Sequence, residues 1–294
     1  MKIIITGSLG NISKPLATQL IAQGQEVTVV SSNPEKAAEI TKLGAQAAIG
    51  SVTDESFLVN TFTGADLIYL MVPTDFGATD LRGYIKSVGQ HYANAVKAAG
   101  AKKVILLSSI GAHLDSGTGP IAGLHDVEQI FGQLKEVDLL ILRPAFFYIN
   151  FYANIGLIKN AGIIGSNYGA DQSIVLVHPA DIAAVAASKI EEGFEGKSVL
   201  YIASDIRKLS EVALALGASI GKSDLPWVEF DDTQAYEGMV AAGLSEEMAR
   251  NYVEMGTAIR SKVLWEDFEA KGIVPAGKIK LEDFATEFAA VYNG

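Results

Sequence analysis

The chain contains no cysteine among its 294 residues. A disulfide framework, a thiolate metal site and a cysteine nucleophile are therefore excluded. The four histidines show no metal-ligand spacing, so no metal site is expected. No apolar run approaches the roughly 20 residues that span a bilayer, and the first residues lack the pattern of a secretory signal. We therefore expect a cytoplasmic protein without a membrane partner.

Basic residues are also scarce. The 23 lysines and arginines against 34 acidic residues give a formal net charge of −11. Such an acidic surface disfavours non-specific contact with nucleic acids. A small-molecule substrate is therefore the expected partner, with a protein partner as the alternative.

What is present begins with an apolar strand that leads into a glycine turn. Residues 3–5 are all isoleucine, a β-branched run typical of the central strand of a parallel sheet. Gly7 and Gly10 then break the chain, and Pro15 is well placed in the first turn of a helix. A strand, a glycine turn and a helix together point free backbone N–H groups and a helix dipole at a phosphate. The pattern therefore predicts a dinucleotide site.

Strand-like and helix-like segments alternate through the first half of the chain. After the first strand, further strands are expected at 26–30, 46–49, 67–72, 103–107 and 137–142, and helices at 53–62 (capped by Thr53), 81–99 and 127–134. Asn33 is expected to cap a helix that ends before Gly44. This alternation predicts a doubly wound parallel sheet of the Rossmann type, with strand order 3-2-1-4-5-6 and a ligand at the carboxyl ends of the strands.

The pattern changes after Pro144. Two more strands are expected at 173–177 and 199–203, with a helix at 179–191 between them, and the chain reads as mostly helical from Ser210 onward. We therefore expect residues 1–145 to form a dinucleotide-binding domain. Residues 173–203 are expected to return to the sheet of that domain. Residues 146–172 and 204–294 are expected to form a smaller, mainly helical, substrate-side lobe of this α/β protein.

Several segments, taken in order, resemble one known family. They are Thr6-Gly7-x-x-Gly10 and residues 33–37, 98–112, 142–150 and 177–183. Together they resemble the NmrA-like branch of the atypical short-chain dehydrogenase/reductase superfamily. The resemblance implies a Rossmann fold that binds a nicotinamide dinucleotide. The cofactor contacts expected from the pattern and the resemblance are Thr6, Gly7, Leu9, Gly10, Asn11, Ile12, Ser31, Ser32, Asn33, Lys36, Met71, Val72, Pro73 and Ser108.

The chain departs from that superfamily in its catalytic residues. A Tyr-x-x-x-Lys pair, in which the lysine lowers the pKa of the tyrosine for proton transfer, occurs nowhere in the sequence. Counting back from Val127-Glu128 puts Pro120 and Leu124 at the corresponding positions. The remaining candidates for a catalytic role are His125, as a general acid, and Ser109. The alternatives are an ordinary packing histidine and a serine that only caps a loop.

Two further histidines differ in what their positions predict. His113 lies in the loop after the fifth strand, where its side chain could contact a ligand. His178 directly precedes the helix that begins at Pro179, so a structural role is expected for it.

The end of the second strand bears on the choice of cofactor. Dehydrogenases that prefer NAD commonly carry an acidic residue there, which binds the ribose hydroxyls and repels a 2′-phosphate. Ser31, Ser32 and Asn33 occupy that end, and Lys36 follows. This favours NADP(H) over NAD(H), with helix capping as the alternative role of the segment.

An aromatic segment follows the sixth strand. Phe146, Phe147, Tyr148 and Phe151, with the polar Asn150, are expected either to line a pocket for a flat acceptor or to form a hydrophobic seam between the two lobes. Both alternatives stay open from the sequence.

Two functions therefore follow from the sequence. One is an NAD(P)H-dependent reductase that transfers hydride to a small conjugated acceptor, such as a quinone, without the Tyr-x-x-x-Lys pair. The alternative is a non-catalytic, NmrA-like dinucleotide sensor that regulates a protein partner.

Overall fold

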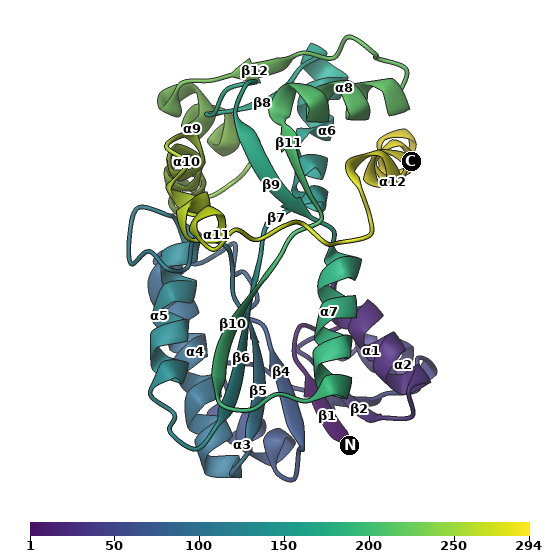
Figure 1. The fold of residues 1–294 in the computed structure, drawn as a ribbon, viewed down its shortest axis with the longest axis vertical. Helices are drawn as coiled ribbons and strands as arrows, with labels where there is room; N and C mark the ends of the chain where they lie inside the picture. Colours follow the sequence, from purple (N-terminus) through teal and green to yellow (C-terminus); the bar gives the residue numbers. More distant parts are fainter.

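The main sheet has seven parallel strands. In the computed structural model, which describes residues 1–294, they are β1 (Lys2–Ile5), β2 (Glu26–Ser31), β3 (Gln46–Ile49), β4 (Leu67–Leu70), β5 (Lys103–Leu107), β6 (Asp138–Pro144) and β10 (Lys197–Ile202). Their order across the sheet is β3-β2-β1-β4-β5-β6-β10, with every neighbouring pair parallel (Figure 1). The predicted order 3-2-1-4-5-6 is confirmed, and β10 extends it beside β6.

Helices cover both faces of this sheet. One face carries α1 (Ser13–Ala22), α2 (Lys36–Lys42) and α7 (Pro179–Glu192), and the other carries α3 (Glu55–Phe62), α4 (Leu81–Ala99) and α5 (Pro120–Gly132) (Figure 1). Ile3 and Ile5 belong to the same buried cluster as Leu16 of α1, whereas Ile4 belongs to the cluster of Leu58 of α3. Because successive side chains of a strand point to opposite faces, a strand buried on both sides must be apolar throughout.

Three predicted helix starts differ from the structure. α3 is capped by Asp54 rather than Thr53, since the Asp54 carboxylate accepts the N–H of Phe57 at 3.0 Å. α5 spans Pro120–Gly132, so it contains most of the expected helical segment 127–134 and begins earlier in the chain. Asn33 accepts the N–H of Glu35 at 2.9 Å in a turn ahead of α2, so it precedes the helix rather than capping it.

Two small sheets lie outside the main one. β9 (Ser173–Val177) pairs in parallel with β7 (Phe146–Phe147) and antiparallel with β11 (Asp205–Lys208), and β8 (Ile164–Ser166) pairs with β12 (Trp227–Glu229). Of the segment 173–203, only β10 joins the main sheet; the expectation that 173–177 would return there is wrong. The reason is that β11 follows β10 closely and folds back along β9, where Ser204 N–H donates to Leu176 O at 2.7 Å.

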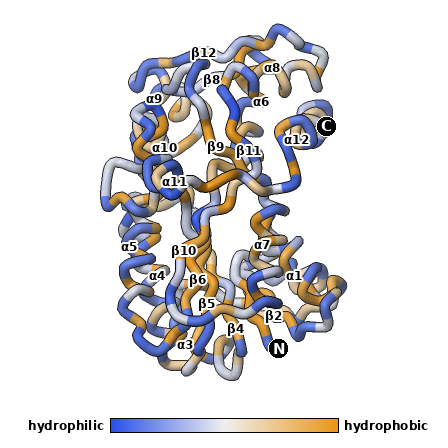
Figure 2. The backbone as a smooth tube through the Cα atoms, viewed as in Figure 1, coloured by the Kyte–Doolittle hydropathy of each residue, from blue (hydrophilic) through white to orange (hydrophobic).

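The remaining helices build the upper lobe around these small sheets (Figure 1). They are η1 (Tyr148–Asn154), α6 (Ile155–Ala161), α8 (Leu209–Ser219), α9 (Asp232–Ala241), α10 (Glu246–Arg260), η2 (Val263–Trp265), α11 (Glu266–Ala270) and α12 (Leu281–Asn293). One cluster of 52 buried residues runs from β1 to α12, so the two lobes share a core. Figure 2 shows this as hydrophobic segments concentrated along the inner strands. No helix combines the length and the apolar character needed to cross a membrane.

Candidate dinucleotide site and the opposite end of the sheet edge

The turn between β1 and α1 requires glycine at its first position. Gly7 has φ +95°, and a Cβ atom built there would lie 2.7 Å from both Met71 Cγ and Ser13 Oγ. Ser8 also has a positive φ, of 55°. Gly10 N–H donates to Gly7 O at 3.1 Å and closes the turn. The backbone is therefore held in a conformation that ordinary side chains rarely adopt.

Hydrogen bonds tie this turn to the ends of β2 and β4. The Met71 N–H donates to Thr6 Oγ1 at 2.8 Å, directly after β4. On the other side, the Ser8 hydroxyl donates to Ser31 Oγ at 2.9 Å, and the Ser8 N–H donates to Val30 O at 2.9 Å. The structure thus brings Thr6, Gly7, Ser31 and Met71 together, as expected. Ser8 was missed, because a serine with positive φ leaves no sequence signal.

The N-terminus of α1 suits a bound phosphate. No side chain caps it, and the Ser13 hydroxyl instead donates back to Thr6 O at 2.8 Å. Gly10 and Asn11 are exposed in front of the helix, Leu9 is half-buried, and Ile12 is buried beneath it. The first N–H groups of a helix need partners, and its dipole favours an anion. This cradle fits the pyrophosphate of a dinucleotide.

The end of β2 carries small polar groups and no acid. Ser31 is buried, whereas Ser32 and Asn33 are exposed. Lys36 Nζ lies 2.9 Å from Glu39 Oε2, and Lys14 Nζ lies 3.2 Å from Glu39 Oε1. Hydrogen bonds from these two lysines lower the pKa of Glu39. Two ammonium groups therefore meet at Glu39 of α2. After β4, Val72 and Pro73 are half-buried.

The hydroxyls after β5 are committed to internal hydrogen bonds. Ser108 Oγ donates to Glu128 Oε1 at 2.5 Å, and Ser109 Oγ donates to Ile110 O at 2.9 Å. His125 Nδ1 lies 3.0 Å from Ala112 O. These bonds correspond to the loop-capping and packing alternatives for Ser109 and His125. Their catalytic role therefore stays a prediction that needs these bonds to break.

A buried ionic network lies near the carboxyl ends of β6 and β10. Arg143 of β6 meets Glu128 of α5 through two bonds, Nε–Oε1 at 3.0 Å and Nη2–Oε2 at 2.6 Å. Its Nη1 donates to Tyr201 of β10 at 2.8 Å, and the Tyr201 hydroxyl donates to Asp267 of α11. Sequence reasoning missed this network, because its members lie far apart in the chain.

Burial and hydrogen bonding shift the pKa values in this network. Burial alone lowers the pKa of Arg143, but the bonds and charge of Glu128 outweigh it, so the pKa is raised. Burial, together with the bond to Asp267, raises the pKa of Tyr201 to about 12. Both groups therefore keep their protons at neutral pH, and the network holds α5, β6, β10 and α11 together.

Pro120 and Leu124 stand at the start of α5. Pro120 is its first residue, and Leu124 lies one turn further on, packed against the cluster that contains Val127. Neither side chain exchanges a proton. Proton chemistry at this edge therefore needs a different group.

The aromatic segment contributes more to the seam than to a pocket wall. Tyr148 is fully buried and stacks on Phe284 of α12 with ring centroids 5.2 Å apart. Phe151 is also buried and meets Trp227 edge-on. Neither ring is free to contact a ligand, which corrects their assignment to the pocket. Phe146 and Phe147 are half-buried and Asn150 is exposed, so these three remain candidates for contact.

The other histidines differ in their partners. His178 caps α7, since its Nδ1 accepts the N–H of Ala180 at 3.1 Å, and its Nε2 lies 3.2 Å from Glu287 Oε2. In His113 neither ring nitrogen has a hydrogen-bond partner, although both are buried. No group of three or more acidic or histidine side chains is arranged to hold a metal ion.

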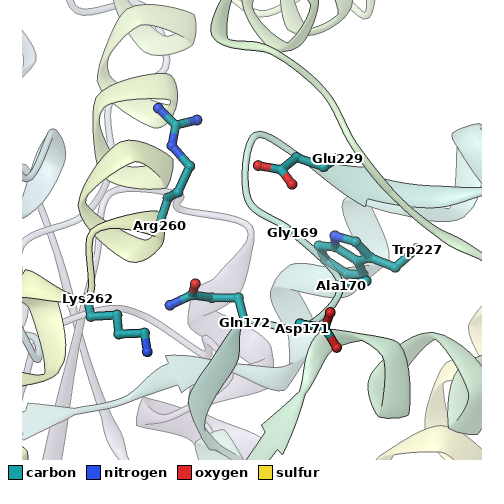
Figure 3. A pocket seen from close by; sticks show the side chains of 8 residues that line it. All are labelled: Gly169, Ala170, Asp171, Gln172, Trp227, Glu229, Arg260 and Lys262. Atoms are coloured by element: carbon teal, nitrogen blue, oxygen red, sulfur yellow. The ribbon is translucent and has the colours of Figure 1, made fainter.

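A separate hollow of about 490 Å³ lies in the upper lobe (Figure 3). The connection between β8 and β9 forms one part of its lining. Trp227 and Glu229 of β12, Arg260 at the end of α10 and Lys262 beyond it form the rest. None of these residues belongs to the glycine turn or to the main sheet. Arg260 is already paired with Asp232 at 2.9 Å. This hollow is therefore distinct from the candidate dinucleotide site.

Comparison with known proteins assigns the first half of the chain. Residues 7–147 match a family model described as NAD(P)H-binding. The match begins at the glycine turn and ends on β7, so it includes β2 to β6. It agrees with the dinucleotide-binding part of the resemblance drawn from the sequence. No curated protein matches the chain.

Solved structures share the fold of the whole chain. An NADPH-dependent quinone oxidoreductase from Escherichia coli, in complex with NADPH, is 20% identical, with a TM-score of 0.75 over 97% of this chain and 99% of that chain. Triphenylmethane reductase from Citrobacter, in complex with NADP(H), is 20% identical, with a TM-score of 0.77 over 98% and 100%. A nucleoside-diphosphate-sugar epimerase from Staphylococcus aureus is 14% identical, with a TM-score of 0.78 over 97% and 100%. At these identities the likeness establishes a Rossmann fold.

Proposed function

We propose that the protein is an NADPH-dependent reductase of small, flat, conjugated acceptors such as quinones. The observation that carries the proposal is the tight turn at Gly7, where a Cβ atom would collide with Met71 and Ser13, in front of the uncapped N-terminus of α1. Reduced nicotinamide supplies a hydride when it is bound. The chain's own residues then have to orient the acceptor and supply a proton.

The end of β2 supports NADPH over NADH. No carboxylate stands on Ser31, Ser32 or Asn33 to repel a 2′-phosphate. Lys36 is held only by an exposed ion pair to Glu39, and such pairs contribute little free energy. Its ammonium group is therefore available to an additional phosphate. Two of the solved structures with this fold were crystallised with NADPH or NADP(H), which points the same way.

The missing catalytic pair supports an acceptor that is easily reduced. Pro120 and Leu124 provide no acid, so an acceptor that needs strong protonation before hydride transfer is disfavoured. A quinone accepts hydride readily, and its oxygen is protonated afterwards. The same absence is compatible with the second function, a dinucleotide sensor without turnover that regulates a protein partner.

Two measurements separate the proposed functions. Calorimetric titration with NADPH, NADP⁺, NADH and NAD⁺ is expected to show tightest binding of the phosphorylated pair. Steady-state oxidation of NADPH with a panel of quinones and enones is then expected to show turnover. Binding without turnover of any acceptor would exclude the reductase and favour the sensor.

A further inference from the structure

The loop between β5 and α5 contains a histidine with no hydrogen-bond partner. Nδ1 and Nε2 of His113 are each buried from solvent, and neither is bonded to another group of the protein. Leaving a buried polar atom unpaired costs about 1–3 kcal/mol, so such atoms are rare in folded proteins. Two on one ring, just beyond the carboxyl end of β5, call for a functional explanation.

Neighbouring bonds fix the backbone on which His113 stands. The Ala112 N–H donates to Ser109 O at 3.2 Å, and the Leu114 N–H donates to Gly111 O at 3.0 Å. Ala112 O in turn contacts Nδ1 of His125 at 3.0 Å. Gly111, with φ +86°, lies so close to η2 that a Cβ atom would be 2.5 Å from Leu264. The loop is therefore held in place while the imidazole of His113 stays unbonded.

Four charged groups surround His113, and three of them are already paired with one another. The three are Asp267 of α11, Lys271 directly after it and Arg143 of β6, and the fourth is Glu266 of α11. Arg143 is bonded to Glu128 and Tyr201, and Asp267 is bonded to Tyr201 and Lys271. Glu266 forms no hydrogen bond to the ring. The network thus surrounds the imidazole without using its nitrogens.

A second unpaired ring nitrogen belongs to η2, the 3-10 helix that meets the loop of His113. Trp265 is the last residue of η2, and its buried Nε1–H has no acceptor. Leu264, the residue before it, is the one that meets Gly111 of the His113 loop. An indole N–H only donates, so a ligand that satisfies it must present an oxygen or another acceptor.

We infer that His113 is the proton donor to the oxygen of the reduced acceptor. This inference rests on the proposed reductase function. The acceptor takes a hydride, with its two electrons, from NADPH, which becomes NADP⁺, and an O–H bond forms as the proton leaves the imidazolium of His113. The neutral imidazole then regains a proton from solvent between turnovers, a step that needs its buried nitrogens to become exposed. His113 thereby takes the place of the tyrosine that the chain lacks.

Burial of the ring sets the pH range of this role. Desolvation lowers the pKa of His113 below its ordinary value of 6.5. A general acid must be protonated to act, so turnover is expected to rise as the pH falls from about 8 to about 5. Arg143, whose pKa is raised, stays charged over this range, and the bonds from Lys271 and Tyr201 hold the pKa of Asp267 below its usual value. His125, whose Nδ1 contacts Ala112 O, is a second imidazole beside this loop. The comparison of His113→Asn with the parent protein therefore decides which ring sets the pH dependence.

The test compares His113→Asn with His91→Asn. His91 lies in the middle of α4, away from the carboxyl edge, and its Nδ1 is also buried without a partner. It therefore controls for the loss of an unpaired imidazole in itself. NADPH affinity and melting temperature, measured for both variants, show whether each keeps the fold and the dinucleotide site.

The expected result is a loss of kcat on the order of 100-fold for His113→Asn, with the rise towards acidic pH abolished. His91→Asn is expected to keep both the rate and the pH profile of the parent protein. A loss below about tenfold, or an unchanged pH profile, overturns the role of His113 while the active parent protein still supports the reductase. A parent protein that turns over no acceptor overturns both proposals at once.

Discussion

The two ends of the sheet's carboxyl edge are built in opposite ways. At the β1–β2 end the chain presents glycine, small hydroxyls and an uncapped helix, with Gly10 and Asn11 exposed. At the β5–β6–β10 end, Glu128, Arg143 and Tyr201 are buried and bonded to one another. The first end leaves the N-terminus of α1 without a side-chain cap and thus open to a ligand. The second uses its polar groups to hold the two lobes together.

The largest expected effect breaks the buried end. Glu128→Ala leaves the guanidinium of Arg143 buried without the carboxylate that accepts two of its hydrogen bonds, which is expected to cost about 3–5 kcal/mol of unfolding free energy. Denaturant-induced unfolding measures this loss. Glu136→Ala, which removes an exposed pair with Lys102, serves as the control. Equal unfolding midpoints for the two variants would contradict a buried, structural network.

The next effect concerns the open end. Gly10→Asp places a carboxylate beside the uncapped α1 terminus, where it repels a pyrophosphate, so NADPH affinity is expected to fall about 30-fold or more, about 2 kcal/mol. Calorimetry measures the affinity. Gly156→Asp in α6 adds the same charge at a position with open space around it and is expected to bind as the parent does. Unchanged binding by Gly10→Asp would mean that the phosphate lies elsewhere.

A smaller effect sharpens the choice of cofactor. Ser32→Asp introduces an acid at the end of β2. This change is expected to lower the affinity for NADPH about tenfold and the affinity for NADH by much less. The ratio of the two dissociation constants is the quantity to measure. Ser32→Ala, which adds no charge, is the matched control. If the ratio stays the same in Ser32→Asp, the 2′-phosphate does not bind at this strand end.

The smallest effect concerns an exposed counterpart of the buried pair. Arg82 of α4 holds Asp126 of α5 at 2.9 Å, and this hydrogen bond lowers the pKa of Asp126. Since the Arg82 side chain is 44% exposed, Asp126→Asn is expected to cost no more than about 1 kcal/mol at neutral pH. Because the folded-state pKa lies below the ordinary 3.8, this contribution is present above that value and disappears as the pH falls through the folded-state pKa. Unfolding curves at neutral and acidic pH test both the size and the sign.

The same contrast explains what the sequence could predict. The open end depends on local signals: residues 3–5, Gly7 and Gly10 specify strand, turn and helix within one short segment. Likewise α4 and β5 have the predicted bounds, because Gly100 ends one apolar pattern and the next begins at Lys103. Local patterns of this kind depend on backbone geometry and on alternating burial, which a short stretch of sequence records.

The buried end depends on contacts between distant residues. Arg143 and Asp267 are 124 residues apart, and no local pattern links them. The pairing of β9 with β11 instead of the main sheet, and the burial of Tyr148 under α12, are likewise decided by tertiary packing. Polar side chains such as Glu128 and Tyr201 fit a surface role equally well from sequence alone. That is why the candidate ligand turn was predicted and the network was not.

The most direct test of the central claim is a crystal structure of the protein with NADPH. We predict that the pyrophosphate lies on the N–H groups at the start of α1, in front of Gly7 and Gly10, with the nicotinamide towards the ends of β4 and β5. A dinucleotide bound in the hollow beside Arg260 and Lys262, with the glycine turn free, would contradict the account.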